Sequence, residues 1–353
     1  AVLANQMKTG QICHTFISNE SEEHPLDPQI FLTPAFGEYW RRLLSVPKLL
    51  WESCSRYLKN PLDSSFLQSL TRLGQALPSG VFDNEPIYEY LSRMWSAPGR
   101  TDDFRQLPNK LYVVAVDLDT GESVKFGAPG YDRVRISRAV QASTALPGLY
   151  PPVKIDGRYF VDGALRKTMH ASVALQEGLD LLFCLNPLVP FDARLAAAAG
   201  RPAQVGRLVE GGLPAVLSQT FRALIHSRLQ VGMEKYNTEF EHSEVILFEP
   251  NRDDAKMFFT NVFSFSGRRW VCEHAYQTTR QDLLARRAEL EPILARHGIR
   301  MRLDVLEDRD RHYYSSLRNQ RGLVTPAPYR GRLVRELSAT LDRLEEITSG
   351  TRG

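Results

Sequence analysis

Hydrophobic residues recur at helical spacing along the first third of the chain. Their intervals of three and four predict a helix at residues 38–60, which Pro47 is expected to break. The turn that follows predicts a second helix at residues 66–77, and a third, shorter helix is expected at residues 85–96. This part of the chain is therefore predicted to be helical.

The period changes from helical to strand-like after residue 110. Residues 111–117 form a continuous β-branched and aromatic run, typical of a strand covered on both faces, and the Asp-Thr-Gly turn after it predicts a hairpin with residues 122–126. A helix is expected at residues 136–144. Residues 153–161 then predict two short strands about Asp156-Gly157, a dipeptide that favours tight hairpin turns.

Strands and helices continue to alternate up to residue 190, with a helix expected at residues 169–177 and a buried strand at residues 180–186. This alternation predicts an α/β layered fold. Beyond residue 190 helical patterns dominate. The elements expected there are helices at residues 204–236, 271–296 and 331–347 and a strand at residues 245–249. We therefore divide the chain into an α/β domain, residues 1–192, and a mainly helical region, residues 193–353.

Composition excludes several classes of protein. The 353 residues are 43% hydrophobic and 24% charged, as in ordinary globular proteins, and no stretch reaches the roughly 18 consecutive apolar residues of a membrane-spanning helix. A net charge of +3 indicates no nucleic-acid partner. Four scattered cysteines without a C-x-x-C pair suit a reducing compartment. The predicted location is the cytoplasm, where any membrane contact is peripheral.

The sequence predicts neither a metal nor an organic cofactor. Its eight histidines are scattered, with no H-x-x-x-H or H-E-x-x-H spacing, so most are expected on the surface or as hydrogen-bonded core residues. Neither G-x-G-x-x-G nor G-x-x-x-x-G-K-[ST] occurs, which argues against a nucleotide site.

The most informative motifs lie between residues 84 and 164. Residues 142–152 read A-S-T-A-L-P-G-L-Y-P-P, and the predicted hairpin after them leads into Asp162-Gly163-Ala164. Upstream, residues 116–121 read V-D-L-D-T-G and residues 84–87 read N-E-P-I. Together these motifs resemble the patatin-like phospholipase family, closely over residues 81–190 and loosely elsewhere.

The resemblance implies a fold and an activity. The expected fold is a patatin-like three-layer α/β/α hydrolase, truncated at its N-terminus and followed by a mainly helical C-terminal extension. The expected activity is hydrolysis of ester bonds in phospholipids or other acyl lipids, of the phospholipase A or lysophospholipase type, by a Ser-Asp dyad without a cofactor. Asp162 matches the family's proton acceptor, and Gly163 and Ala164 complete its D-G-A motif.

Two Asp-Gly pairs lie close together, and their surroundings distinguish them. Asp156-Gly157 stands between two strands, where both residues can adopt the positive φ of a hairpin turn. Asp162 follows the second strand, at the sheet edge where α/β folds bind ligands. We therefore expect Asp156 to be architectural and Asp162 to be catalytic.

The family's nucleophile, a serine in a G-x-S-x-G elbow, is absent from these 353 residues. The opening Ala-Val-Leu-Ala-Asn is similar to the helix that follows the elbow in the family. We therefore expect the nucleophile and the glycine-rich oxyanion loop a short distance upstream, and no activity in the chain as given. Ser143 is an alternative nucleophile near Asp162, but no strand-turn-helix pattern presents its hydroxyl.

Other interpretations remain open. The chain could be a non-catalytic patatin-fold protein that binds lipid or protein, or an unrelated α/β binding protein in which Asp162 is a plain turn residue. Arg138 could hold a phosphate headgroup or form a structural salt bridge. A further set of apolar residues could form a lipid-facing lid or pack in the core: Trp40, Leu49, Leu50, Trp51 and Trp95.

Overall fold

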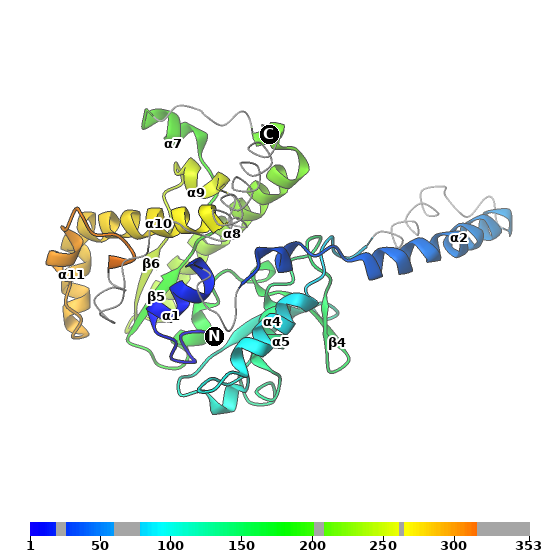
Figure 1. Cartoon of the computed structure of the whole chain (residues 1–353), viewed down its shortest axis with the longest axis horizontal. Helices are drawn as coiled ribbons and strands as arrows, with labels where there is room; N and C mark the ends of the chain where they lie inside the picture. The colour runs from blue at the N-terminus through cyan, green and yellow to red at the C-terminus, as the bar shows by residue number, and fades with distance from the viewer. Residues whose placement is uncertain (19–25, 60–77, 201–207, 261–264, 316–353) are drawn as a thin grey trace, which may run out of the picture. The chain divides into compact units, whose positions relative to one another are not determined.

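The computed structural model describes residues 1–18, 26–59, 78–200, 208–260 and 265–315. The chain forms two compact units, Ala1–Arg302 and Leu303–Gly353, and the described part of the second begins with the short helix α12 (Leu303–Leu306). The first unit combines strands with helices, as the α/β prediction requires (Figure 1). Its short helical segments are α1 (Thr9–Cys13), η1 (His14–Ser18), η2 (Pro28–Leu32), η4 (Phe104–Gln106), α7 (Ala193–Ala198), η6 (Leu208–Gly211) and α9 (Ala255–Phe259).

The first unit contains an antiparallel sheet. Within the described residues its strand order is β2-β1-β4-β3, with bounds β1 (Val113–Asp117), β2 (Ser123–Phe126), β3 (Val153–Ile155) and β4 (Arg158–Asp162). Both predicted hairpins are confirmed. Asp156 and Gly157 have φ values of +50° and +83°, the paired positive values that a two-residue turn between twisted strands needs.

The strand β1 is central and covered on both faces. Its last three residues, Ala115, Val116 and Asp117, are all buried, although successive side chains point to opposite faces. The Asp117 carboxylate lies at the strand end, where it accepts hydrogen bonds from the backbone N–H groups of Asp119 and Thr120 at 2.9 and 3.0 Å. The V-D-L-D-T-G motif is thus a strand followed by a side-chain-capped turn.

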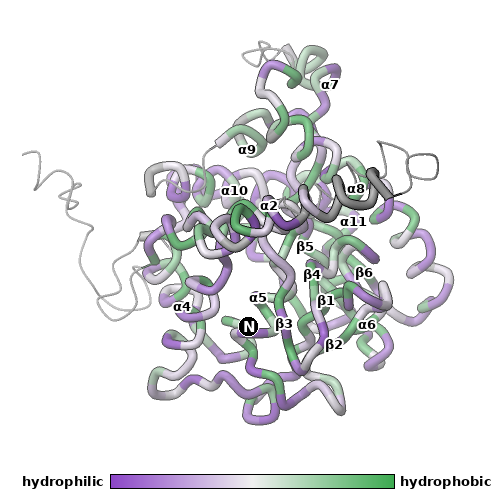
Figure 2. Tube along the Cα trace, turned by 90° about the vertical axis from the view of Figure 1, so that its right-hand side faces the viewer, coloured by the Kyte–Doolittle hydropathy of each residue, from purple (hydrophilic) through white to green (hydrophobic). Residues whose placement is uncertain are grey.

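Two helices build the main core against this sheet. Helix α5 (Ile136–Ser143) packs on α4 (Glu85–Trp95) and on strands β1 and β4. The largest fully buried side chains between them are Trp95, Phe126, Phe160, Met94 and Ile136. Figure 2 shows hydrophobic segments along the labelled strands, in agreement with their apolar sequences. This packing holds the end of β4 in place.

A second sheet pairs strands that are far apart in sequence. Strand β5 (Leu181–Leu185) runs parallel to β6 (Glu244–Phe248), with Leu181 opposite Glu244. The intervening chain contains helix α8 (Gly212–Glu239), whose buried Tyr236 packs with Cys184 of β5 and with helix α6 (Ala171–Leu175). Such a long helical connection is what parallel pairing requires.

The parallel pair bears on the predicted division at residue 192. Because β5 precedes residue 192 and β6 follows it, their pairing joins the two predicted regions within the compact unit Ala1–Arg302. The division therefore stays a prediction about where the patatin-like part ends, and it is not a boundary between compact units.

Two details differ from the predicted helices. Helix α2 (Phe36–Lys59) continues through Pro47 instead of breaking there, since a proline removes one intrahelical hydrogen bond while the flanking turns remain. The predicted helix at 271–296 is two helices, α10 (Phe265–Ala285) and α11 (Arg287–Arg296). Arg286 separates them, and its guanidinium donates to the Leu247 carbonyl of β6, which fixes the bend. The helices expected at residues 66–77 and 331–347 lie outside the described residues.

No helix in the described ranges is both long enough and apolar enough to cross a bilayer.

Candidate active site

The Asp162-Gly163-Ala164 motif forms the junction between a strand and a helical turn. Asp162 is the last residue of β4, opposite Ala115 of β1, and its backbone N–H donates to the Ala145 carbonyl at 3.0 Å. The 3₁₀ turn η5 (Gly163–Leu165) begins immediately afterwards, and the Asp162 carboxylate caps it by accepting a hydrogen bond from the Ala164 N–H at 2.8 Å. The strand end and the cap together fix the carboxylate.

Gly163 allows this junction to lie directly against the central strand. A Cβ atom at position 163 would stand 2.4 Å from the carbonyl oxygen of Val114 in β1, closer than real Cβ contacts. Because the obstacle is backbone in the middle of a sheet, it cannot turn aside as a side chain can. The glycine of the motif is therefore required by close approach of two backbones.

Burial changes the acidity of Asp162. It raises the pKa of the Asp162 carboxyl above its usual value, while the hydrogen bond from the Ala164 N–H opposes part of that rise. A raised pKa makes the carboxylate a stronger base, as proton abstraction from a hydroxyl requires. Asp156, by contrast, has an exposed side chain in its hairpin turn. The structure thus confirms the turn expected at Asp156-Gly157, while the catalytic role of Asp162 stays a prediction.

The raised pKa of Asp162 predicts a pH-dependent stability difference. Below the pKa of an unfolded aspartate, about 3.9, Asp162 is protonated in both the folded and the unfolded chain. As the pH rises above that value, the unfolded chain loses this proton first. The free energy of unfolding therefore falls with rising pH. An asparagine at this position does not titrate and keeps an oxygen for the Ala164 N–H. In urea unfolding, Asp162→Asn should match the native chain near the unfolded pKa and be more stable at neutral pH. A stability difference that is independent of pH would contradict the assignment.

His170 also belongs to this site, although no sequence pattern pointed to it. Its Nε2 lies 3.0 Å from the carbonyl oxygen of Gly163, so the ring donates from Nε2. Burial lowers the pKa of His170, the hydrogen bond to the Gly163 carbonyl opposes part of that fall, and the charges of Lys167 and Arg166 add to it. Met169 and His170 both have positive φ, a rare backbone conformation for residues other than glycine. We interpret His170 as a positioning residue for the D-G-A turn.

Ser143, the alternative nucleophile, is hydrogen-bonded to the antiparallel sheet. Its hydroxyl donates to the carbonyl of Val114 at 2.8 Å, the same oxygen that Gly163 approaches. Ser143 is also the last residue of α5, with no strand-turn-helix geometry to expose its Oγ. The geometry favours a structural role for this serine.

The segment that contains this junction is similar to a known family. Residues 33–175 match the family model for patatin-like phospholipases. The matched segment includes strands β1, β2, β3 and β4, helices α4 and α5 and the D-G-A motif, so the likeness to the family lies in this part of the chain. A patatin-like domain implies an α/β hydrolase-like fold, and the strands and helices of the matched segment agree with it.

The N-E-P-I motif of the patatin-like segment forms an ion-pair network. The Arg138 guanidinium holds both carboxylate oxygens of Glu85, at 2.9 and 3.0 Å, and stacks on the Tyr88 ring at 3.7 Å from its centroid. Gln141 joins the network by donating to Asn84 at 3.0 Å. The structural salt bridge expected for Arg138 is confirmed, and it locks α5 onto the start of α4.

The apolar residues considered for a lid fall into separate environments. Trp95 is 1% exposed and belongs to the core of the patatin-like segment. Trp40 and Trp51, both on α2, are 67% and 77% exposed. The side chains of Leu49 and Leu50 lie outside the described residues. The core interpretation therefore holds for Trp95, and the lipid-facing interpretation stays open for α2.

Proposed function

We propose that this protein is a patatin-type serine acyl hydrolase that cleaves ester bonds of phospholipids or other acyl lipids, with Asp162 as the base of a Ser-Asp dyad. The observation that carries the proposal is the half-buried, backbone-capped carboxylate of Asp162 at the end of β4, at the D-G-A position of the matched segment. Gly163 and Ala164 complete that motif. The activity is of the phospholipase A or lysophospholipase type.

The chemistry follows from a carboxylate that acts without a histidine. A serine hydroxyl attacks the ester carbonyl while Asp162 takes its proton, and the alcohol leaves to give an acyl-enzyme that water then hydrolyses. Backbone N–H groups of a glycine-rich loop would stabilise the oxyanion. No metal or organic cofactor takes part. The serine and this loop are not among the 353 residues, so we place both upstream of Ala1.

The proposal includes the finer points of architecture and location. The complete protein has a three-layer α/β/α hydrolase domain that ends near residue 192 and a mainly helical extension after it. It works in the cytoplasm with peripheral contact to a membrane, where its substrates lie. The helices α8, α10 and α11, together with the ordinary composition of the chain, support this arrangement.

A serine-directed fluorophosphonate probe tests the proposal. The 353-residue chain should take no label and hydrolyse no nitrophenyl ester, because an aspartate without its serine has nothing to activate. A longer chain that includes the upstream G-x-S-x-G elbow should take one label per molecule and hydrolyse the ester. Stoichiometric labelling of Ser143, or a longer chain that is inert, would contradict the proposal and favour a non-catalytic patatin-fold binding protein.

A further inference from the structure

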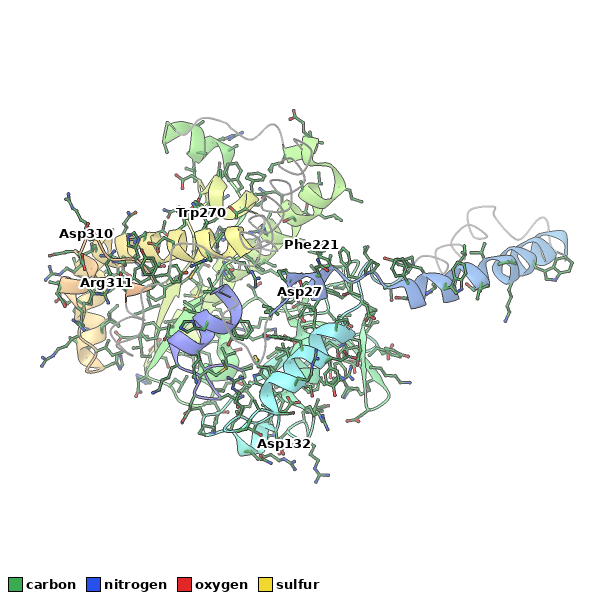
Figure 3. All side chains as sticks on the ribbon, in the orientation of Figure 1. Asp27, Asp132, Phe221, Trp270, Asp310 and Arg311 are labelled. Carbon is green, nitrogen blue, oxygen red and sulfur yellow. The ribbon has the colours of Figure 1, made fainter. Side chains whose placement is uncertain are left out.

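Helix α2 carries a continuous apolar face that is exposed to solvent. This face, called the α2 apolar face below, consists of Phe36, Trp40, Leu43, Leu44 and Trp51, whose side chains are between 57% and 77% exposed. At 3.6 residues per turn, the five positions fall within an arc of about 100°. Figure 3 draws the side chains of α2 as sticks. So large an exposed aromatic and aliphatic stripe on one side of a helix indicates a surface that binds a protein or a membrane.

The attachment of α2 uses residues beside and opposite the apolar arc, and one of them, Tyr39, contacts the Phe36 ring edge-to-face. Glu38 accepts hydrogen bonds from the backbone N–H and the hydroxyl of Ser79 at 3.1 and 2.7 Å, and the Tyr39 hydroxyl donates to the Val81 carbonyl. Neither Glu38 nor Tyr39 is part of the α2 apolar face, which remains available to a partner.

The charge of α2 indicates what that partner is. The α2 sequence contains five Lys or Arg and two Glu, so the helix carries +3 (5 − 2), which equals the net charge of the whole chain. Lys48 is exposed and lies outside the arc of the apolar face. A helix with a basic polar side and a Trp- and Leu-rich apolar side lies flat in the interface of a membrane and is attracted by anionic lipids.

The residues of the face favour a bilayer over a second protein helix. Tryptophan prefers the water–lipid boundary, and Trp40 and Trp51 supply it along the face. Pro47, also exposed, stands in the middle of the same arc. A helix–helix seam places Leu, Ile or Val at such positions, so a proline there disfavours a coiled coil.

We propose that the α2 apolar face docks this protein on the surface of an anionic phospholipid bilayer. The choice of a bilayer rests on the proposed function, because an acyl-lipid hydrolase must reach substrate that is packed in a membrane. Docking needs no catalysis, so the two proposals can fail separately. The occupant is the membrane surface itself.

Vesicle co-sedimentation of the 353-residue chain tests the docking. Binding should be stronger to vesicles of phosphatidylcholine with phosphatidylserine than to phosphatidylcholine alone, and it should weaken as salt is raised from about 0.1 M to about 1 M. The double variant Trp40→Ser with Trp51→Ser should lower the vesicle partition coefficient at least about tenfold. Both tryptophans are exposed, so circular dichroism should show an unchanged fold.

A matched pair of leucines supplies the control. Leu44 on the α2 apolar face and Leu185 at the end of β5 are both 71% exposed. Leu44→Ser should weaken vesicle binding, whereas Leu185→Ser should leave it unchanged. Equal effects of these two substitutions, or full binding by the double tryptophan variant, would overturn the docking proposal.

Two further outcomes separate the alternatives. If analytical ultracentrifugation finds a dimer that the double tryptophan variant dissociates, and vesicles bind neither form, the face belongs to a second copy and the proposal is wrong. If the native chain binds anionic vesicles through α2 while the longer chain hydrolyses no ester, the docking stands and the proposed function fails. If the longer chain hydrolyses esters but does not bind vesicles, the proposed function stands and the docking proposal fails.

Discussion

Asp162→Asn should lower ester hydrolysis by at least about a hundredfold in a chain that includes the nucleophile elbow, the low end of the effect of losing a general base. Asparagine has nearly the same shape and still offers an oxygen to the Ala164 N–H, so the cap of η5 should survive. What disappears is the ability to take a proton from the serine. The measurement is the turnover of a short-chain nitrophenyl ester, with circular dichroism to check the fold.

Asp156→Asn is the matched control for this substitution. Asp156 lies six positions earlier in the same hairpin, also precedes a glycine, and has an exposed side chain in the turn. Because Asn-Gly adopts the same turn, turnover should remain near normal. If the Asp162→Asn enzyme folds and works at the native rate, the Ser-Asp dyad is wrong. The protein is then either a non-catalytic binding protein or an enzyme with a different nucleophile.

Local sequence patterns predicted the elements around Asp162 well. The apolar run that forms β1 and the Asp156-Gly157 turn are decided within a few residues of chain, and both appear as expected. The motif that ends β4 is equally local. Even so, the sequence identified Asp162 through resemblance to a family, because a D-G-A triplet by itself also suits an exposed turn.

Local sequence patterns could not predict contacts between residues that are far apart in the chain. The hydrogen bond of His170 to Gly163 depends on two successive positive-φ residues that are not glycine, which no propensity predicts. The pairing of β5 with β6 is set by the long helix between them. The bend at Arg286 comes from its bond to Leu247, a residue 39 positions away. In each case tertiary contact decides the local backbone.

The continuity of α2 through Pro47 has a similar explanation. Proline disfavours a helix because it removes one backbone hydrogen bond, but this loss affects only one position of the 24-residue helix α2. The residues on either side keep their own hydrogen bonds and their amphipathic order. The same order places Pro47 within the α2 apolar face, where it bears on the choice of partner.

Gly163→Ala should cost both stability and activity, in contrast to Asp162→Asn. The added methyl group would meet the Val114 carbonyl at 2.4 Å, so either β1 or the D-G-A turn must shift. Forcing an extra methyl group into such a packed position costs about 1–3 kcal/mol, measurable as a lower urea midpoint. A shift of the turn by about 1 Å also misplaces the Asp162 carboxylate, which can lower turnover by about a hundredfold.

Gly37→Ala is the control that separates crowding from the loss of a glycine as such. Gly37 lies in α2, and a Cβ there would meet nothing within 4 Å. Alanine is the better helix former by about 0.8–1.0 kcal/mol, so this substitution should leave stability unchanged or raise it, with normal turnover. If Gly163→Ala were as harmless as Gly37→Ala, the close approach to Val114 would not constrain the motif. If it lost stability but kept full activity, the position of Asp162 would not depend on that approach, and the catalytic assignment would lose its geometric basis.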